Sequence, residues 1–334
     1  MDTQRIGMDV GYGDTKAAVK VNGAVKTVSF PSVLGNAERQ VKASVLGGRQ
    51  SRVMRLGYKG VEYYVGDDAI HHSRTLGAGR QDRQRIGSDE ERILMLAALA
   101  QLGIENASIV TGLPVLWFAE EYKTLKGSWR GEHRLFVNGK ERIITVTSVR
   151  VIPQPFGGFY HHFLNDAGQA TVGEDEIMRT YGFLDVGFNT TDISAIQRLQ
   201  PEGKWSRGVQ VGVRNVIGMV GEDILHDLGC QFDQHEVDRA IRAGHIEVYG
   251  QSHDISRWVE SATEHLAGDV RKVATDAWGN GERLAKVLIF GGGAAVMGKA
   301  LLKVFPRNGV LLPNPAMANA IGFCKIAQRQ TVRA

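Results

Sequence analysis

Apolar and polar positions at the start of the chain follow a short strand-like pattern. Apolar residues alternate with polar ones, or form short runs, over residues 5–10, 15–21 and 24–30, and glycine-containing turns separate these stretches. The third stretch ends at Pro31, which cannot donate to a strand ladder. The chain is therefore predicted to open with a β-meander.

Strand-like and helix-like stretches then alternate. Residues 90–102 have the apolar periodicity of a helix, with Ser88 and Glu91 placed as a capping box and Gly103 as the stop. Further strands are predicted at residues 53–58, 61–66, 107–113 and 147–153, a helix and a hairpin between residues 115 and 150, and another helix beginning at residue 154. This alternation is typical of an α/β protein.

The opening pattern recurs near the middle of the chain. A strand over residues 181–186, a turn and a strand over residues 191–199 repeat the first hairpin, and the pentads MDVGY and LDVGF place Asp9 and Asp185 at equivalent points, about half the chain apart. An internal duplication is the natural interpretation. After it, helices are predicted from residue 215 to 278, then a strand at residues 286–290, three glycines, and a last helix beginning near Ala316.

Length and composition narrow the class of protein. The chain has 334 residues, which favours two domains, and its 43% hydrophobic and 23% charged residues are typical of a soluble globular protein. No apolar run reaches the length of a membrane span, and the first residues are too polar and too acidic for a signal peptide. These features predict a cytoplasmic protein that has no membrane partner.

Cysteine content and net charge exclude two further classes. Cys230 and Cys324 are too few for a disulfide framework and lack partners at zinc-ligand spacing. The net charge of +4 is too small to indicate a nucleic-acid-binding surface, so no direct binding to nucleic acid is expected.

The two glycine-containing turns are candidate phosphate-binding elements. Glycine lets backbone N–H groups converge on an anion, and a carboxylate at the end of the preceding strand, Asp9 or Asp185, could hold the waters of a hydrated Mg²⁺. Lys16 would add positive charge, and the hydroxyls of Thr190 and Thr191 could donate hydrogen bonds. The alternative is a pair of ordinary hairpins. Two such turns together favour a clamp on a triphosphate.

Five motifs in order resemble those of the actin superfamily, and of the bacterial plasmid-segregation (ParM/StbA) actins in particular. They are DVGYGDTK at residues 9–16, VIPQPFGGFY at 151–160, LDVGFNTTDIS at 184–194, VLIFGGGAAVM at 287–297 and NPAMANAIGF at 314–323. The resemblance implies an α/β, ribonuclease H-like, two-lobed ATPase fold with a duplicated core. It places one domain at residues 1–153 plus 315–334 and the other at residues 154–314.

The resemblance also assigns roles to residues. It implies that ATP or ADP with Mg²⁺ is bound by Gly11, Tyr12, Gly13, Asp14, Thr15, Lys16, Gly187, Phe188, Asn189, Thr190, Thr191, Glu222, Gly291, Gly292 and Gly293. Asp9 and Asp185 would hold Mg²⁺ through water, and Gln154 falls where the family places the residue that orients the attacking water. Since an amide is no strong base, hydrolysis would be slow and would depend on positioning.

The function implied by the resemblance is a filament-forming ATPase that acts in plasmid DNA segregation. Its copies would associate with one another, and an adaptor protein bound to centromere-like plasmid DNA would link the filament to its cargo. Two alternatives remain: a nucleotide switch in plasmid maintenance that does not polymerise, and a small-molecule kinase or phosphatase of the same fold.

Three other signals are weaker. The second turn has Phe188 and Asn189 where the heat-shock chaperones have glycines, which leaves the choice between ATP and GTP open. The sequence GAAVMGK at residues 293–299 has P-loop spacing but ends in Ala300, where a P-loop needs Ser or Thr. The arginine-rich stretch at residues 74–92 is interpreted as a solvated loop, with a DNA contact or a filament contact as alternatives.

Overall fold

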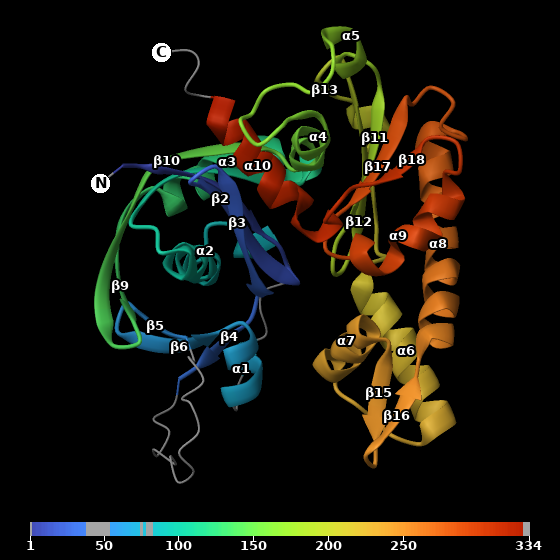
Figure 1. Ribbon diagram of the computed structural model, residues 1–334, viewed down its shortest axis with the longest axis horizontal. Coiled ribbons are helices and arrows are strands. Elements are labelled where there is room, and N and C mark those ends of the chain that lie inside the picture. Colours follow the sequence, from blue (N-terminus) through green and yellow to red (C-terminus); the bar gives the residue numbers. More distant parts are fainter. Residues whose placement is uncertain (1, 38–53, 74–75, 78–82, 330–334) are drawn as a thin grey trace. The chain divides into compact units, whose positions relative to one another are not determined.

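The computed structural model describes residues 2–37, 54–73, 76–77 and 83–329, and the chain forms two compact units (Figure 1). Unit 1 comprises the chain up to Thr171 together with the segment from Asn319, and unit 2 runs from Val172 to Ala318. Each unit has its own hydrophobic core. In the described part of the chain, no helix is both long enough and apolar enough to cross a membrane.

Unit 1 is built on one large sheet. In sheet order its strands are β3 (Ala24–Pro31), β2 (Asp14–Val21), β1 (Gln4–Val10), β8 (Asn106–Leu113), β10 (Lys140–Pro153), β9 (Gly131–Val137), β5 (Arg55–Tyr58), β6 (Val61–Val65), β4 (Leu34–Asn36) and β7 (Leu76–Gly77). Its helices are α1 (Asp67–His72), α2 (Asp89–Leu102), α3 (Val115–Trp129), α4 (Pro155–Phe163) and α10 (Ala318–Gln328), with a 3₁₀ turn at Arg83–Arg85.

Helix α2 lies inside the curve of this sheet (Figure 1). Its residues from Ile93 to Leu99 are all buried, and it packs on β1, β2, β3 and β5. A helix that is apolar on all sides is stable only when surrounded by protein. Half of the predicted capping box is present, because Ser88 Oγ accepts a hydrogen bond from the Glu91 N–H, whereas the Glu91 carboxylate accepts from the Gly87 N–H. Gly103 ends the helix in a left-handed conformation.

Unit 2 is built on a smaller sheet. Its strands run in the order β13 (Gln200–Pro201), β12 (Thr191–Gln197), β11 (Tyr181–Val186), β17 (Lys286–Phe290) and β18 (Gly309–Leu311), and β14 (Arg207–Val209) also pairs with β12. A separate hairpin consists of β15 (His245–Val248) and β16 (Gln251–Asp254). The helices are α5 (Glu174–Ile177), α6 (Val213–Leu228), α7 (Gln234–Ala243), α8 (Ser256–Trp278) and α9 (Ala294–Val304), with 3₁₀ turns at Gly203–Trp205 and Pro315–Met317.

The two sheets share one topology over four strands each. In unit 1, β1 pairs antiparallel with β2 and parallel with β8, which pairs parallel with β10. In unit 2, β11 pairs antiparallel with β12 and parallel with β17, which pairs parallel with β18. The same order and directions in both units are what the predicted duplication requires.

Two predictions from the sequence differ from the structure. The region predicted as helical up to residue 278 contains the hairpin β15–β16, and α9 and β18 were not predicted. The units also divide later than the predicted boundaries at residues 153 and 314. The reason is that α4 packs on α10: a Cβ on Gly157 would lie 2.5 Å from Asn319 Oδ1, and one on Gly322 would lie 1.8 Å from the Gly157 carbonyl oxygen.

Candidate functional site

The two predicted turns have the same backbone geometry. In the first, the Gly11 N–H donates to the Asp14 carbonyl oxygen at 3.0 Å, and in the second the Gly187 N–H donates to the Thr190 carbonyl oxygen at 2.8 Å. Both turns follow the strand at the centre of the duplicated motif, β1 in unit 1 and β11 in unit 2. The repeat recognised in the sequence is therefore a repeat in the structure, down to the hydrogen bond that closes each turn.

A carboxylic acid, Asp9, and an amine, Lys16, lie opposite each other on the two strands that the first turn joins. Asp9 of β1 and Lys16 of β2 are directly opposite in the antiparallel register, so their side chains lie on the same face of the sheet. Lys16 is 5% exposed, and its Nζ is 3.9 Å from Asp14 Oδ2. Burial raises the pKa of Asp9, an effect opposed by the Lys16 charge and by a hydrogen bond from the Asn319 side chain.

Arg85 holds the first turn, a role that the sequence did not reveal. Its side chain is buried, Nη1 donates to the Gly11 carbonyl oxygen at 2.9 Å, and the guanidinium lies 5.4 Å from the centre of the Tyr12 ring. Burial lowers the pKa of Arg85, and Glu90 forms an ion pair with it at 3.7 Å. Because the Gly11 carbonyl points to Arg85, the N–H of the same trans peptide, that of Tyr12, points the opposite way.

The solvated-loop interpretation of the arginine-rich stretch is therefore wrong at Arg85. Arg83 is exposed and pairs with Glu120 and Glu121, as that interpretation expected. Residues 74–75 and 78–82 of the stretch lie outside the described residues. Arginine spacing alone does not distinguish the two side chains, because a 3₁₀ turn at Arg83–Arg85 points one outward and one into the unit.

Glu91 adds a buried acid behind Arg85. It is 6% exposed and accepts a hydrogen bond from the Gly87 N–H at 2.7 Å, and burial raises its pKa to about 7. A carboxyl group with a raised pKa in the folded state keeps its proton when the unfolded chain has lost it. Its contribution to stability is therefore full below pH 4.5, its ordinary value, and is lost as the pH rises to about 7.

The variant Glu91→Gln should remove this pH dependence, because glutamine keeps the neutral form at every pH. A pKa change from 4.5 to about 7 corresponds to on the order of 3 kcal/mol. Urea unfolding of both proteins at pH 5 and pH 8 measures it. We expect the wild type to lose more stability than the variant between the two values. Equal losses would mean that Glu91 is ionised in the folded protein.

Gln154 lies at the same sheet edge as Asp9. It follows β10 directly, and its N–H donates to the Leu113 carbonyl oxygen at the end of β8 at 2.8 Å. Strands β1, β8 and β10 are parallel neighbours, so their carboxyl ends meet at one edge. A Cβ on Gly112 would lie 2.8 Å from Gln154 Cα, so a side chain at position 112 would displace Gln154.

In unit 2, a glycine segment packs directly on the second aspartate. Asp185 is 6% exposed, and a Cβ on Gly291 would lie 2.4 Å from its Oδ1. Gly291 also has a φ of 97°, which L side chains rarely adopt. The Gly293 N–H donates to the Val186 carbonyl oxygen at 2.8 Å, and Gly292 lies between the two glycines. Gly291 and Gly293 therefore fix the end of β11, in addition to any contact that they make with a nucleoside.

The second turn is held by the N-terminus of α6. The N–H groups of Val213 and Arg214 donate to the carbonyl oxygens of Gly187 and Phe188 at 3.3 and 2.9 Å. In trans peptides the following N–H groups, those of Phe188 and Asn189, then point away from the helix. A Cβ on Gly212 would lie 2.4 Å from the Phe188 carbonyl oxygen. In each unit, backbone N–H groups of the turn therefore point away from the group that holds the turn, which is Arg85 in unit 1 and α6 in unit 2.

Two predicted threonines are placed differently from the expectation, whereas Glu222 stays a predicted nucleoside contact. The Thr191 hydroxyl donates to the Val211 carbonyl oxygen at 2.7 Å, and Thr15 Oγ1 lies 2.8 Å from Ser32 Oγ; both threonines are fully buried. These hydroxyls therefore stabilise the strands next to the turns, and Thr190 alone of the threonine pair lies in the turn. Glu222 is exposed on α6.

The described residues suit a metal ion bound jointly by protein and phosphate better than a metal ion bound by protein ligands alone. No group of three or more His, Cys, Asp or Glu side chains in the described part of the chain could hold a metal. Mg²⁺ commonly keeps several waters and takes one or two carboxylates together with substrate phosphates. One aspartate at each turn fits that pattern.

Comparisons with known proteins agree with this arrangement. The family model described as the N-terminal domain of actin-like proteins matches residues 7–157, and that of the archaeal actin homologue MreB-like C-terminal domain matches residues 183–303. Together they cover both turns and both halves of the duplication. The chain is thus similar to actin-like proteins in both halves. The predicted fold class, an actin-like α/β fold with a duplicated core, is confirmed.

The similar proteins align with this chain over nearly its whole length. An archaeal actin homologue of Thermoplasma volcanium is 28% identical, with 97% of this chain and 98% of the relative aligned; that of Thermoplasma acidophilum is also 28% identical, with the same coverage. Among solved structures, an archaeal actin homologue in complex with ADP has a TM-score of 0.80 at 22% identity, covering 99% of this chain and 100% of the other. A 15-stranded ParM filament from Clostridium botulinum has a TM-score of 0.78 at 24% identity, covering 98% and 100%.

These findings support a similarity to actin-like proteins in general more strongly than a similarity to the plasmid-segregation actins. The curated relatives are archaeal actin homologues, and the ParM structures are similar only at low sequence identity. A role in plasmid segregation is therefore a proposal for this chain.

Proposed function

We propose that this protein binds ATP and ADP with Mg²⁺ through the glycine turns of both units and hydrolyses ATP slowly. The observation that carries the proposal is the repeated turn, closed by the same hydrogen bond and preceded by an aspartate in each unit. A nucleotide would supply phosphate oxygens that accept hydrogen bonds from the N–H groups of these turns. The ADP complex of a similar archaeal structure supports the same ligand class.

The residues of unit 1 fit a phosphate group. The buried ammonium of Lys16 forms an ion pair with Asp14 at 3.9 Å. Because this pair is long, binding of a further anion to the ammonium would be favourable. The first turn supplies backbone N–H groups, and Arg85 fixes its shape from behind. Phosphate recognition by a lysine and backbone N–H groups needs no further protein charge.

The remaining polar groups divide the catalytic work. Asp9 and Asp185 would bind the waters of Mg²⁺, and the ion would neutralise charge on the phosphates. Gln154, at the carboxyl end of β10, would hold the attacking water through its amide oxygen and NH₂ group. Because an amide cannot remove the proton from water, catalysis rests on orientation, which agrees with slow turnover.

Gln154→Ala tests this assignment. We expect the rate of ATP hydrolysis to fall about 100-fold with little change in ATP affinity, since a positioning group acts mainly in the transition state. Phosphate release under single-turnover conditions gives the rate, and a titration with a fluorescent ATP analogue gives the affinity. Equal losses in rate and affinity would indicate a binding role instead.

We further propose that the protein assembles into filaments and that the filaments segregate plasmid DNA through a DNA-bound adaptor protein. The similarity to a ParM filament supports assembly. Light scattering and sedimentation with ATP, ADP and no nucleotide test it. Absence of nucleotide-dependent assembly at tens of micromolar protein would contradict the filament and favour the nucleotide switch, while leaving nucleotide binding in place.

A further inference from the structure

A tyrosine stands at the tip of the hairpin in unit 2 with almost no protein contact. Tyr249 is 95% exposed, whereas the next most exposed large apolar side chain among the described residues, Leu116, is 64% exposed. Tyr249 and Gly250 form the two-residue loop that joins Val248 to Gln251. A single exposed aromatic residue is common on protein surfaces, so its exposure alone indicates little.

The backbone of Tyr249 makes the residue informative. Its φ is 50° and that of Gly250 is 76°, so both loop residues are left-handed. Such loops favour Asn-Gly, because a positive φ is energetically unfavourable for a bulky residue. The Tyr249 side chain is 95% exposed, so it gains little packing within the unit to offset this cost. Backbone strain at one residue points to a role outside the folded unit.

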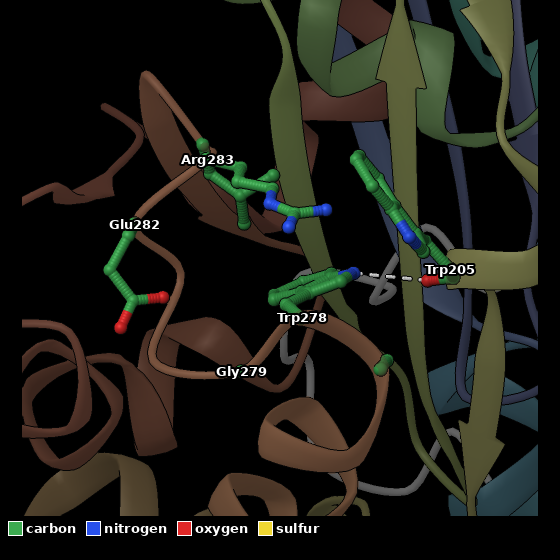
Figure 2. Close-up of a pocket in the computed structure, with 7 residues that line it drawn as sticks. Trp205, Trp278, Gly279, Glu282 and Arg283 are labelled. Carbon is green, nitrogen blue, oxygen red and sulfur yellow. Dashed lines mark hydrogen bonds between the residues drawn. The ribbon is translucent and has the colours of Figure 1, made fainter.

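A cavity with aromatic walls lies at the other end of unit 2. Its volume is about 290 Å³, and it is lined by Trp205, Ala277, Trp278, Gly279, Glu282, Arg283 and Leu284. Trp278 Nε1 donates to the Trp205 carbonyl oxygen at 3.0 Å, which fixes one wall to the other. Figure 2 shows the guanidinium of Arg283 extending toward the two indole rings, while the Glu282 carboxylate points away. This volume is at the lower end of the range for ligand pockets, about 300–1,000 Å³, and is large enough to admit one aromatic side chain.

Helix α8 separates the hairpin from the cavity. It begins at Ser256, directly after β16, and ends at Trp278 in the cavity wall, so its 23 residues span roughly 35 Å. Figure 1 shows the hairpin β15–β16 near one end of this helix, and Trp278 of the cavity wall is the last residue at the other end. They cannot meet within one chain, but they can meet between two copies that stand head to tail.

Cationic side chains lie at the cavity and an acid lies on the hairpin. Exposed Arg283 lines the cavity together with Glu282, and the ammonium of exposed Lys204 lies 5.4 Å from the centre of the Trp205 ring. On the hairpin, exposed Glu247 precedes Tyr249 by two residues. An ion pair at the rim of an apolar contact contributes mainly to orientation and to the rate of association.

We propose that Tyr249 of one copy inserts between Trp205 and Trp278 of the next copy along a filament. The proposal rests on the assembly proposed above and names its contact. A surface that binds a different surface of an identical partner does not close on itself after two copies, so repetition gives an open chain of subunits. Aromatic residues that fill a desolvated pocket commonly dominate such interfaces.

Tyr249→Asn separates assembly from stability. Asparagine suits the left-handed loop, so the variant should unfold at a temperature equal to or above that of the wild type. We expect its critical concentration for assembly to rise at least about tenfold, while Tyr249→Phe assembles as the wild type does. Sedimentation with ATP over a range of protein concentrations gives the critical concentrations, and thermal unfolding gives the stability. An unchanged critical concentration in Tyr249→Asn would overturn the contact and leave the filament proposal intact.

A mixing experiment tests the direction of the contact. Ala277→Phe would fill the cavity and leave the hairpin unchanged, and Tyr249→Asn does the reverse. At protein concentrations between the critical concentration of the wild type and those of the variants, neither variant should assemble alone. An equimolar mixture should stop at a dimer, with one hairpin in one open cavity. Analytical ultracentrifugation distinguishes these outcomes. Polymers formed by Ala277→Phe alone would overturn the proposal.

Crosslinking decides the contact even if the wild type forms no filaments. With p-benzoylphenylalanine in place of Tyr249, irradiation at high protein concentration should link two copies, and mass spectrometry should map the links to residues 203–207 or 277–284. Such links without polymers would contradict the filament function but retain the contact. Polymers with links only elsewhere would contradict the contact alone.

Discussion

Lys16→Met should bind ATP about 100-fold more weakly than the wild type, because it removes the buried ammonium at the first turn. The folded protein should be as stable as the wild type or more so. The ion pair of Lys16 with Asp14 is long, at 3.9 Å, so it offsets little of the desolvation free energy of the buried ammonium, and methionine fills a similar volume without that cost. Loss of affinity together with retained stability is the expected signature of a phosphate-binding lysine.

Isothermal titration calorimetry with ATP and Mg²⁺ measures the affinity, and thermal unfolding without nucleotide measures the stability. Lys26→Ala is the matched control, because Lys26 is exposed on the neighbouring strand and should affect neither quantity. If Lys16→Met binds ATP normally, the first turn does not contact phosphate. If it unfolds at a much lower temperature, Lys16 is a structural residue.

Gly212→Ala should displace the second turn. The backbone at Gly212 has a φ of −153°, which alanine adopts readily, so only the close approach of the Phe188 carbonyl oxygen forbids a side chain. A Cβ there would lie 2.4 Å from a backbone atom, and the turn must move away from α6 to admit it. We expect a loss of about 1–3 kcal/mol of stability, typical of overpacking, and at least a tenfold loss in ATP affinity.

Gly218→Ala on the same helix is the control. No atom lies within 4 Å of the point that a Cβ at this position would occupy, and an exposed glycine within a helix costs about 0.5–1 kcal/mol relative to alanine. This variant should therefore be slightly more stable and bind ATP normally. Equal behaviour of the two variants in both assays would show that the docking of the second turn on α6 has no role in binding.

The sequence predicted what depends on local pattern and repetition. The paired strands around Asp9 and Asp185, the cap at Ser88 and the strand before Gly291 all follow from residues close together in the chain. The duplicated sheet order followed from the same repeat, since each copy folds by the same rules. These features are encoded within a few residues, which is why a single sequence suffices to find them.

The parts that could not be predicted depend on contacts between distant segments. Arg85 reaches Gly11 across 74 residues of sequence, and no periodicity marks it as different from Arg83. The Thr191 hydroxyl donates a hydrogen bond to the carbonyl oxygen of Val211, a residue of a separate segment. The division at Thr171 depends on α4 packing against α10 from the other end of the chain. Tertiary packing decides each of these.

The two turns of the duplicated site are held by different kinds of chemistry. A side chain, Arg85, holds the first turn, whereas backbone N–H groups at the start of α6 hold the second. A side-chain contact can be altered by one nucleotide change in a gene, but a backbone contact persists through most substitutions. The first half of the site can therefore diverge through substitution of Arg85, and the second half tolerates most substitutions except those at points of close approach such as Gly212.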